Sequence, residues 1–295
     1  MGSSKGLIQD VIQQKILLDD LSNDELVNFC QQANLAYRDG NPIVSDQDYD
    51  FIYLAELQKR LPRHELLQSI EPEGHGFSDD KVLLPEIMLS TDKAYSWDEI
   101  QKWLERLQKS AQEIGLDKGL IRIKATSKLD GFAGYDDGLR LYTRGDGKKG
   151  SDITRVFDRG LQVFNGSARG QGAGEIVIKK SYFETHLSQD FEYPRNFQAS
   201  LIKEKALDTK AKQAITDKAA LFVPFAQLPT WLGSIDELRN EFTSIVENML
   251  SLVNFDVDGV VFEVTNNDLK NQMGANRKFH RWQIAFKENK DKAQV

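Results

Sequence analysis

Residues 121–131 read Ile-Arg-Ile-Lys-Ala-Thr-Ser-Lys-Leu-Asp-Gly, and the rest of the chain is organised around this stretch. Apolar and polar residues alternate here, which predicts a strand with Thr126, Lys128 and Asp130 on one face. Gly131 then allows a turn, and residues 132–135 and 139–142 read as the two strands of a hairpin. A lysine at a strand end beside a carboxylate suits an amine nucleophile, because burial and neighbouring cations lower the pKa of its amine.

The Lys-x-Asp-Gly pattern at Lys128 is a weak signal when taken alone. Three specified positions occur by chance at roughly the ten per cent level in a chain of this length, which favours a surface hairpin with a solvated lysine. Six further motifs follow it in order: Arg144-Gly145-Asp146-Gly147, Gly150-Ser151-Asp152-Ile153-Thr154, Gly174-Glu175-Ile176, Pro194-Arg195-Asn196, Asp258-Gly259-Val260-Val261 and Arg281-Trp282-Gln283-Ile284-Ala285-Phe286-Lys287. The series resembles the nucleotidyltransferase (adenylation) domain of NAD-dependent DNA ligases, and the resemblance covers nearly the whole chain.

The composition is that of an ordinary globular protein. The 295 residues are 40% hydrophobic and 28% charged, enough for one large or two modest domains. No long apolar run or signal-peptide pattern is present, so no membrane association and a cytoplasmic location are expected. Cys30 is the single cysteine, which excludes an internal disulfide and a multi-cysteine zinc site and predicts a buried thiol.

The net charge of −7 argues against strong, autonomous binding of nucleic acid, because neutralisation of phosphates supplies most non-specific affinity. The resemblance implies nicked duplex DNA as the partner, and other domains or a second subunit would then provide much of the affinity for DNA. The family continues beyond the adenylation domain into an oligonucleotide-binding domain. We therefore expect a catalytic fragment or a separately encoded catalytic subunit.

Two domains of different class are predicted. Residues 1–78 carry apolar residues at helical spacing and capping residues at Ser22 and Ser45, which predicts a small helical domain and a linker. Residues 79–295 predict a mixed domain of largely antiparallel sheets, so the fold class is α+β. The linker is placed at residues 70–84, which are rich in glycine, proline and acidic residues.

The helical domain contains an acidic and aromatic patch. Asp46 and Asp50 are four residues apart on one helix face, with Tyr49 beside them and Tyr37 upstream. Such a patch suits a ribose and a cationic aromatic ring, although a capping box with a solvated acidic face is the plainer interpretation. The segment resembles the N-terminal domain of NAD-dependent ligases, which implies that all four residues bind the nicotinamide mononucleotide half of NAD. Asp48 replaces the usual glutamate of that motif.

The resemblance assigns further nucleotide contacts in the second domain. Ser90 and Thr91 lie in a Met-Leu-Ser-Thr-Asp segment that would flank the dinucleotide, with Thr91 in place of the family's leucine. Arg144 lies in a glycine-rich loop that could bring a guanidinium to a phosphate or to the base and ribose. Arg195 is a phosphate contact by resemblance, and an ordinary surface arginine is equally compatible with the local sequence. Glu175 would act on the ribose and on a divalent metal.

The resemblance implies a concrete reaction. Lys128 would attack the AMP phosphorus of NAD, nicotinamide mononucleotide would leave, and the lysyl-AMP intermediate would pass AMP to a nick 5′-phosphate in DNA replication and repair. Asp130 and Lys287 complete the expected catalytic set. A magnesium ion near Glu175 and Asp130 would neutralise charge. The alternatives are a degenerate module that binds a nucleotide without chemistry, and a nucleotidyltransferase with another acceptor.

Base recognition is where the sequence departs most from the family. The family places a glutamate two residues before the nucleophile and a lysine in the Asp-Gly-Val-Val strand, and this chain has Thr126 and Glu263 there. This exchange of donor and acceptor would suit guanine better than adenine. Adenine would still fit if burial kept Glu263 protonated, or if Lys124 on the Thr126 strand face replaced the missing lysine.

Overall fold

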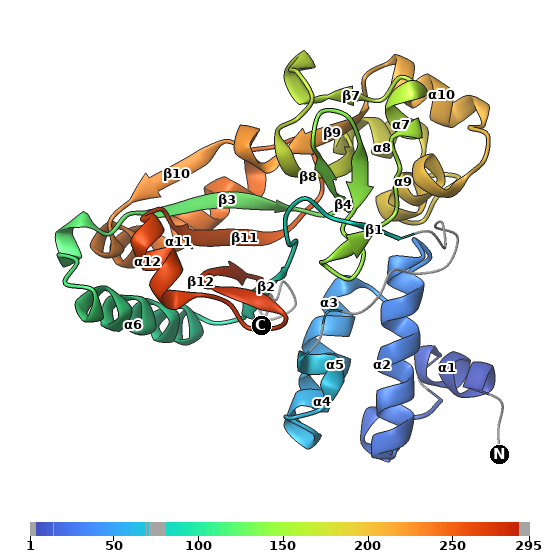
Figure 1. Cartoon of the computed structure of the whole chain (residues 1–295). Helices are drawn as coiled ribbons and strands as arrows, with labels where there is room; N and C mark the ends of the chain where they lie inside the picture. The colour runs from blue at the N-terminus through green and yellow to red at the C-terminus, as the bar shows by residue number, and fades with distance from the viewer. Residues whose placement is uncertain (1–3, 14, 69, 71–80, 289–295) are drawn as a thin grey trace. The chain divides into compact units, whose positions relative to one another are not determined.

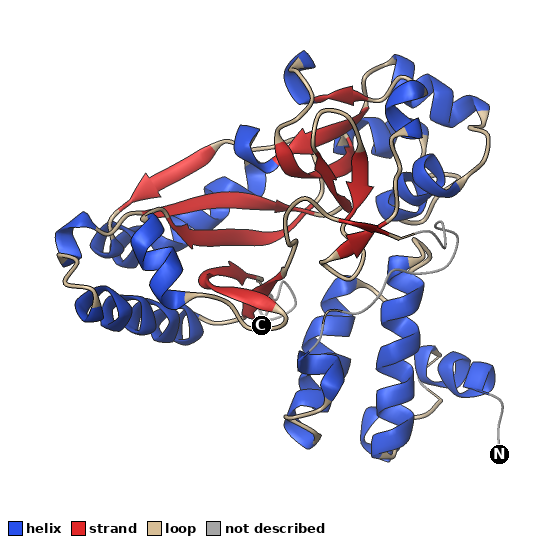
Figure 2. Ribbon diagram, in the orientation of Figure 1, coloured by secondary structure: helices blue, strands red, loops and turns tan. Residues whose placement is uncertain are grey.

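The computed structural model describes residues 4–13, 15–68, 70 and 81–288. It divides into two compact units, residues 1–77 and 78–295, and each is described by itself. Most of the predicted linker, residues 71–80, lies outside the described residues. Helices occur together with mixed and largely antiparallel sheets, consistent with the α+β class (Figure 2).

The described part of the first unit contains helices and loops. Its elements are α1 (Ser4–Ile12), η1 (Leu18–Asp20), α2 (Asn23–Arg38), α3 (Asp46–Asp48), η2 (Tyr49–Leu54), α4 (Ala55–Arg60) and α5 (Glu65–Gln68). A capping box between Ser22 and Glu25 starts α2, because each side chain satisfies a backbone N–H of the other residue. Phe29 and Cys30 on α2 are fully buried in the core of this unit, which confirms the prediction of a buried thiol.

The second unit contains the sheets and further helices. Its helices are α6 (Trp97–Glu113), η3 (Lys118–Leu120), α7 (Arg155–Asp158), η4 (Phe164–Gly166), α8 (Lys180–His186), α9 (Pro194–Lys203), α10 (Thr209–Thr216), η5 (Phe225–Gln227), α11 (Ile235–Ser251) and α12 (Asn267–Met273). Its strands are β1 (Val82–Leu83), β2 (Ser90–Ala94), β3 (Ile123–Leu129), β4 (Phe132–Asp136), β5 (Leu141–Thr143), β6 (Lys149–Gly150), β7 (Gln162–Val163), β8 (Gly172–Ile178), β9 (Ala220–Pro224), β10 (Thr230–Gly233), β11 (Val257–Val264) and β12 (Phe279–Phe286).

Two five-stranded sheets form the frame of the second unit (Figure 1). One has the order β10-β3-β11-β12-β2 and the other β5-β4-β8-β9-β7, and a two-stranded sheet joins β1 to β6. All pairs are antiparallel except β2 with β12 and β7 with β9. The predicted hairpin is confirmed as β4 paired with β5. Glu175 lies in the middle of β8.

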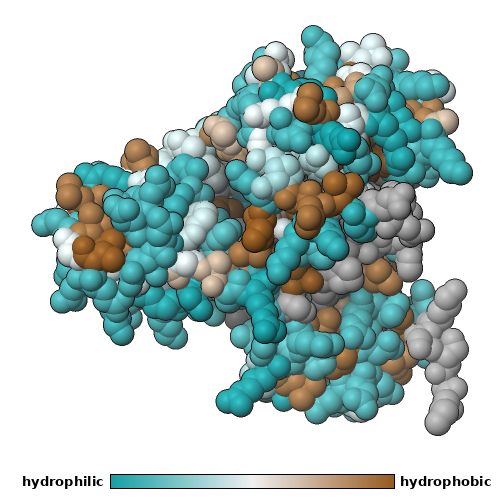
Figure 3. Space-filling view, viewed as in Figure 1, coloured by the Kyte–Doolittle hydropathy of each residue, from teal (hydrophilic) through white to brown (hydrophobic). Residues whose placement is uncertain are grey.

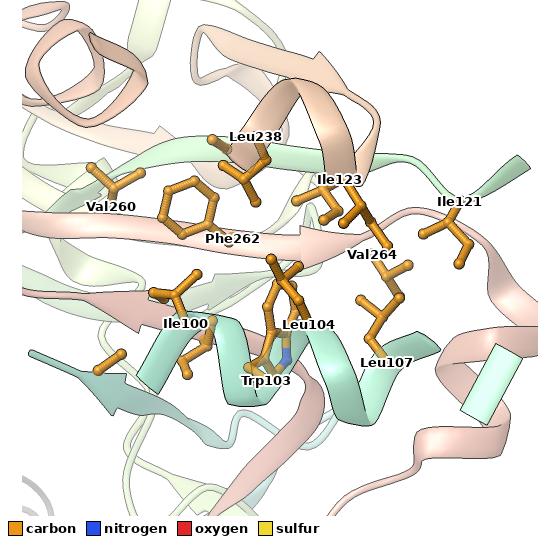
Figure 4. Close-up of a cluster of buried hydrophobic side chains, with 14 of the residues drawn as sticks. Ile100, Trp103, Leu104, Leu107, Ile121, Ile123, Leu238, Val260, Phe262 and Val264 are labelled. Carbon is orange, nitrogen blue, oxygen red and sulfur yellow. The ribbon is translucent and has the colours of Figure 1, made fainter. Parts of the chain in front are cut away.

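A hydrophobic core lies between the first of these sheets and the helices α6, α11 and α12. Trp103 and Leu104 of α6 and Leu238 of α11 meet Val260 and Phe262 of β11 there (Figure 4). Alternate residues of a strand point to opposite faces, so this core fixes which residues of β3 and β11 face the other way. The residues facing away from the core include the predicted nucleophile.

Hydrophilic side chains cover most of the face drawn in Figure 3, and the hydrophobic ones form separate small groups. Among the described residues, no helix combines the length and the apolar character needed to cross a membrane.

Candidate active site

Lys128 lies at the end of β3, and strand register sets its direction. β3 pairs with β11 so that Lys128 is opposite Gly259 and Thr126 is opposite Val261. Ser127 points to the core side, where its hydroxyl donates to the carbonyl of Met249 on α11 at 2.5 Å. Lys128 therefore projects from the opposite face, as the alternating sequence predicted.

Asp258 holds two lysines together. Lys128 Nζ lies 2.9 Å from both Oδ1 and Oδ2 of Asp258, and Lys287 Nζ lies 3.0 Å from Oδ2. Burial opposes ionisation of Asp258, but the two ammonium groups outweigh it and hold the pKa of this carboxyl well below its ordinary value. Gly259 makes the approach possible, because a Cβ there would lie 2.4 Å from the carbonyl oxygen of Phe286.

The sequence interpretation did not include Asp258 among the site residues. Its place directly before Gly259 in the Asp-Gly-Val-Val motif was the available signal. A side-chain role could not be assigned from it, because Asp258 meets Lys128 only through the pairing of β3 with β11, 130 residues apart.

Arg195 holds the turn after the nucleophile strand. Its Nη1 lies 3.2 Å from Asp130 Oδ1 and donates to the carbonyl of Gly131 at 2.5 Å, and its guanidinium covers the ring of Phe132. Gly131 itself fits tightly against β8, since a Cβ there would lie 2.3 Å from the carbonyl oxygen of Ile176. Arg195 and Asp130, both predicted site residues, are thus brought into one ion pair next to Lys128.

Glu175 is a buried carboxyl in the same neighbourhood. Burial raises the pKa of Glu175 to about 7, although Lys128, Arg195 and Arg144 act in the opposite direction. The negative charge of Asp130 also raises the pKa of Glu175, so Asp130 lies near Glu175. Five predicted site residues therefore lie near one another: Lys128, Asp130, Arg144, Glu175 and Arg195.

Glu175 and Asp130 are also the predicted metal ligands. In the described part of the chain, no group of three or more histidine, cysteine, aspartate or glutamate side chains is arranged to hold a metal. Glu175 and Asp130 supply two hard oxygen ligands, which fits magnesium because this ion commonly uses one or two carboxylates together with waters and substrate phosphates.

Ser90, Thr91 and Arg144 lie along the edge strand of the first sheet and a neighbouring loop. Arg144 Nη1 donates to Ser90 Oγ at 3.3 Å, so the glycine-rich loop is tied to β2. Thr91 follows in β2 and is partly buried. These contacts bring together two segments that the sequence assigned separately to the nucleotide.

The four predicted residues of the first unit lie on α2, α3 and η2. Tyr37 is partly buried in the last turn of α2, and Asp46 begins α3. Asp50 is 4% exposed. The hydroxyl of Tyr49 donates to the carbonyl of Cys30 at 3.4 Å and accepts from Asn34, which fixes this ring against α2.

The helix that carries Tyr49 and Asp50 is irregular. Residues Tyr49–Leu54 form a π-helix between the α-helical turns on either side, which the sequence did not predict. π-Helical turns occur frequently at functional sites, because the extra residue changes the direction of the side chains.

Thr126 on β3 and Glu263 on β11 lie on the sheet face that carries Lys128. Thr126 is buried opposite Val261, and Glu263 is paired with Lys124 across the strands. The Glu263 side chain is 20% exposed and forms ion pairs with Lys124 and Lys270. Glu263 is therefore engaged by cations at the sheet surface.

The pKa of Glu175 predicts a pH-dependent stability. The folded protein binds the Glu175 proton more tightly than the unfolded chain, so this stabilisation is lost as pH rises from 4.5 to about 7. The Glu175→Gln variant keeps a neutral side chain throughout. We expect its free energy of unfolding, relative to the parent, to increase by roughly 3 kcal/mol across this window.

The measurement is urea unfolding of both proteins in a chelating buffer at several pH values. Glu184→Gln, at an exposed position on α8, serves as the matched control. A difference between parent and Glu175→Gln that stays constant with pH would contradict the expected titration.

Comparison with known proteins adds independent information. Residues 80–224 match the family model described as the NAD-dependent DNA ligase adenylation domain. The DNA ligase of Vesicomyosocius okutanii is 68% identical over 292 residues, which are 99% of this chain and 46% of that protein. The DNA ligase of Ruthia magnifica is 70% identical over 278 residues, 94% of this chain and 45% of that protein. The DNA ligase of Desulfotalea psychrophila is 53% identical over 93% of this chain. The chain thus spans about half the length of the first two relatives.

Proposed function

The chain belongs to the NAD-dependent DNA ligase family, and from this premise we propose that it transfers AMP from NAD to Lys128. The observation that carries the proposal is the grouping of Lys128 with Asp258 and Lys287, next to Asp130, Arg195 and Glu175. A nucleophilic amine with neighbouring cations and hard oxygen ligands suits attack on a phosphoanhydride such as the pyrophosphate of NAD.

The covalent step joins Lys128 Nζ to the AMP phosphorus and breaks the bond from that phosphorus to the oxygen of nicotinamide mononucleotide. Asp258 positions the amine but is a poor acceptor for its protons, because two lysines keep the pKa of Asp258 low. The protons that the Lys128 ammonium group loses when the nitrogen–phosphorus bond forms therefore pass to solvent. Lys287 contacts the same carboxylate of Asp258 and can neutralise a phosphate oxygen. Arg195 fixes the Asp130 turn so that Lys128 keeps its direction.

Glu175 and Asp130 would hold magnesium, which supplies charge neutralisation at the phosphates. Because burial raises the pKa of Glu175 to about 7, a cation at this position would also favour its ionised form. Tyr37, Asp46, Tyr49 and Asp50 are proposed to bind the nicotinamide mononucleotide half, and Ser90, Thr91 and Arg144 the remainder of the dinucleotide.

AMP is then proposed to pass to the 5′-phosphate of nicked duplex DNA, in replication and repair in the cytoplasm. The net charge of −7 leaves this chain poorly suited to grip DNA through a basic surface. Further domains, such as an oligonucleotide-binding domain, would supply that grip, in keeping with relatives about twice as long as the matched part.

The proposal is tested by the intact mass of the protein after incubation with magnesium and either NAD or ATP. We expect one added AMP per chain with NAD, an equal amount of released nicotinamide mononucleotide, and at least about tenfold less labelling with ATP. An unmodified protein would favour the alternative of a nucleotide-binding module without chemistry. Equal labelling by ATP and NAD would exclude NAD as the specific donor.

A further inference from the structure

The sheet face that carries Lys128 continues into a second polar group. From β3 it presents Lys128, Thr126 and Lys124, and opposite them β11 presents Gly259, Val261 and Glu263. Side chains two residues apart on a strand are about 7 Å from each other, so Lys124 lies about 13 Å from Lys128 along β3. A nucleotide with its phosphorus at Lys128 has this face available to it in one direction. In the other direction lies the Asp130–Gly131 turn, which Arg195 occupies.

The surface between Lys128 and Lys124 changes from apolar to charged along β3. Thr126 is buried and contributes a hydroxyl, and Val261 beside it is apolar. Lys124 and Glu263 follow, with side chains 31% and 20% exposed. An apolar floor with polar groups at its far end is suited to a flat heterocycle whose edge carries donors and acceptors.

Three charged groups meet at this far end. Lys124 Nζ lies 2.9 Å from Glu263 Oε1, and Lys270 Nζ of α12 lies 3.4 Å from the same oxygen. Lys270 also covers the ring of Trp282, which keeps it in place from the other side. The carboxylate is thus neutralised by two ammonium groups, and the cluster as a whole carries a single positive charge.

We propose that Lys124 determines base specificity, by donating a hydrogen bond to the ring nitrogen at the edge of adenine. Thr126, which can accept as well as donate, faces the neighbouring amino group. Glu263 is a positioning residue in this arrangement: it holds the flexible Lys124 side chain at the far end of the face and does not itself read the base. The inference rests on the proposed function, because it takes the phosphorus of the nucleotide to lie at Lys128.

The physical reason for the assignment is the balance of donors and acceptors. An ammonium group has donors only, so it meets an unprotonated ring nitrogen well and a ring N–H badly. Hypoxanthine presents an N–H and a carbonyl where adenine presents a bare nitrogen and an amino group. A well-formed pair of contacts to a base edge typically discriminates by about tenfold to a hundredfold.

The experiment compares NAD with its hypoxanthine analogue in single-turnover labelling of the whole chain. For the parent we expect at least about tenfold better use of NAD, seen in the dinucleotide concentration that gives half-maximal rate. Lys124→Met is expected to reduce this preference to within about threefold, because methionine has no donor for the ring nitrogen. The exposed Lys102 on α6, replaced by methionine, is the matched control and should keep the full preference.

Glu263 is tested by a double-mutant comparison. Glu263→Gln alone should lower the preference for NAD, and adding it to Lys124→Met should change the preference no further, because Glu263 acts through Lys124. An equal loss in both backgrounds would overturn the positioning role. A preference for NAD that survives Lys124→Met, or better labelling by a guanine dinucleotide than by NAD, would overturn the assignment of Lys124.

Failure of the proposed function can be distinguished from failure of the Lys124 assignment. If the proposed function is wrong, the parent forms no adduct with either dinucleotide. Equilibrium binding of AMP and IMP to the parent and to Lys124→Met then tests base reading without the covalent step. A preference for AMP that disappears in the variant supports the assignment of Lys124, and equal binding of both nucleotides by the parent overturns it.

Discussion

Lys128→Ala is expected to abolish covalent labelling by NAD, because no other group can replace the amine at the end of β3. Lys128 Nζ is held by both carboxylate oxygens of Asp258 at 2.9 Å, so its direction is fixed before substrate arrives. Lys287 also forms an ion pair with Asp258, but from the position just after β12. The measurement is the intact mass after incubation with NAD and magnesium, with no added AMP in the variant.

The fold should survive this change. Asp258 keeps Lys287 as a counterion, and the Lys128 side chain is 25% exposed, so the loss of packing is small. The far-ultraviolet circular dichroism of Lys128→Ala should therefore match that of the parent, and Lys102→Ala on the exposed side of α6 should label normally. Covalent AMP on the alanine variant would show that another residue is the nucleophile.

Asp258→Asn is expected to damage both stability and chemistry. The amide keeps the shape of the side chain but removes the charge that neutralises Lys128 and Lys287, and two ammonium groups then face each other. Breaking a buried ion pair in this way costs about 3–5 kcal/mol. Lys128 also loses its fixed direction, and misplacement of a reacting group by an ångström can cost about a hundredfold in rate.

Urea unfolding and single-turnover labelling separate these two effects. The control is Asp236→Asn, which removes an exposed carboxylate that contacts Arg239 and should alter neither quantity appreciably. Adding Lys287→Met to Asp258→Asn should recover part of the stability, because one uncompensated cation is removed, without restoring the labelling rate. Labelling of Asp258→Asn at the parent rate would contradict the role of Asp258 in orienting Lys128.

The sequence was informative wherever structure follows from residues close together in the chain. Alternation from Ile121 to Lys128 predicted a strand, and β3 occupies Ile123–Leu129. The turn at Gly131 and the strand-like residues 132–135 and 139–142 predicted the hairpin of β4 and β5. Ser22 and Ser45 were expected to cap helices, and each side chain accepts from the backbone N–H three residues later. These features depend on local propensity and hydrogen bonding within a few residues.

The contacts that make the site were decided by tertiary structure. Asp258 reaches Lys128 only because β3 and β11 pair in a particular register, and Arg195 meets Asp130 because α9 packs beside the turn. The pKa of Glu175 is raised by burial, which a strand sequence alone does not reveal. Glu263 forms ion pairs with Lys124 and Lys270, and only the folded chain shows these contacts. The sequence determined which chemical groups the protein carries and on which strand face each lies. Register and packing determined which of them meet, because the distance between residues far apart in a chain is set by the fold.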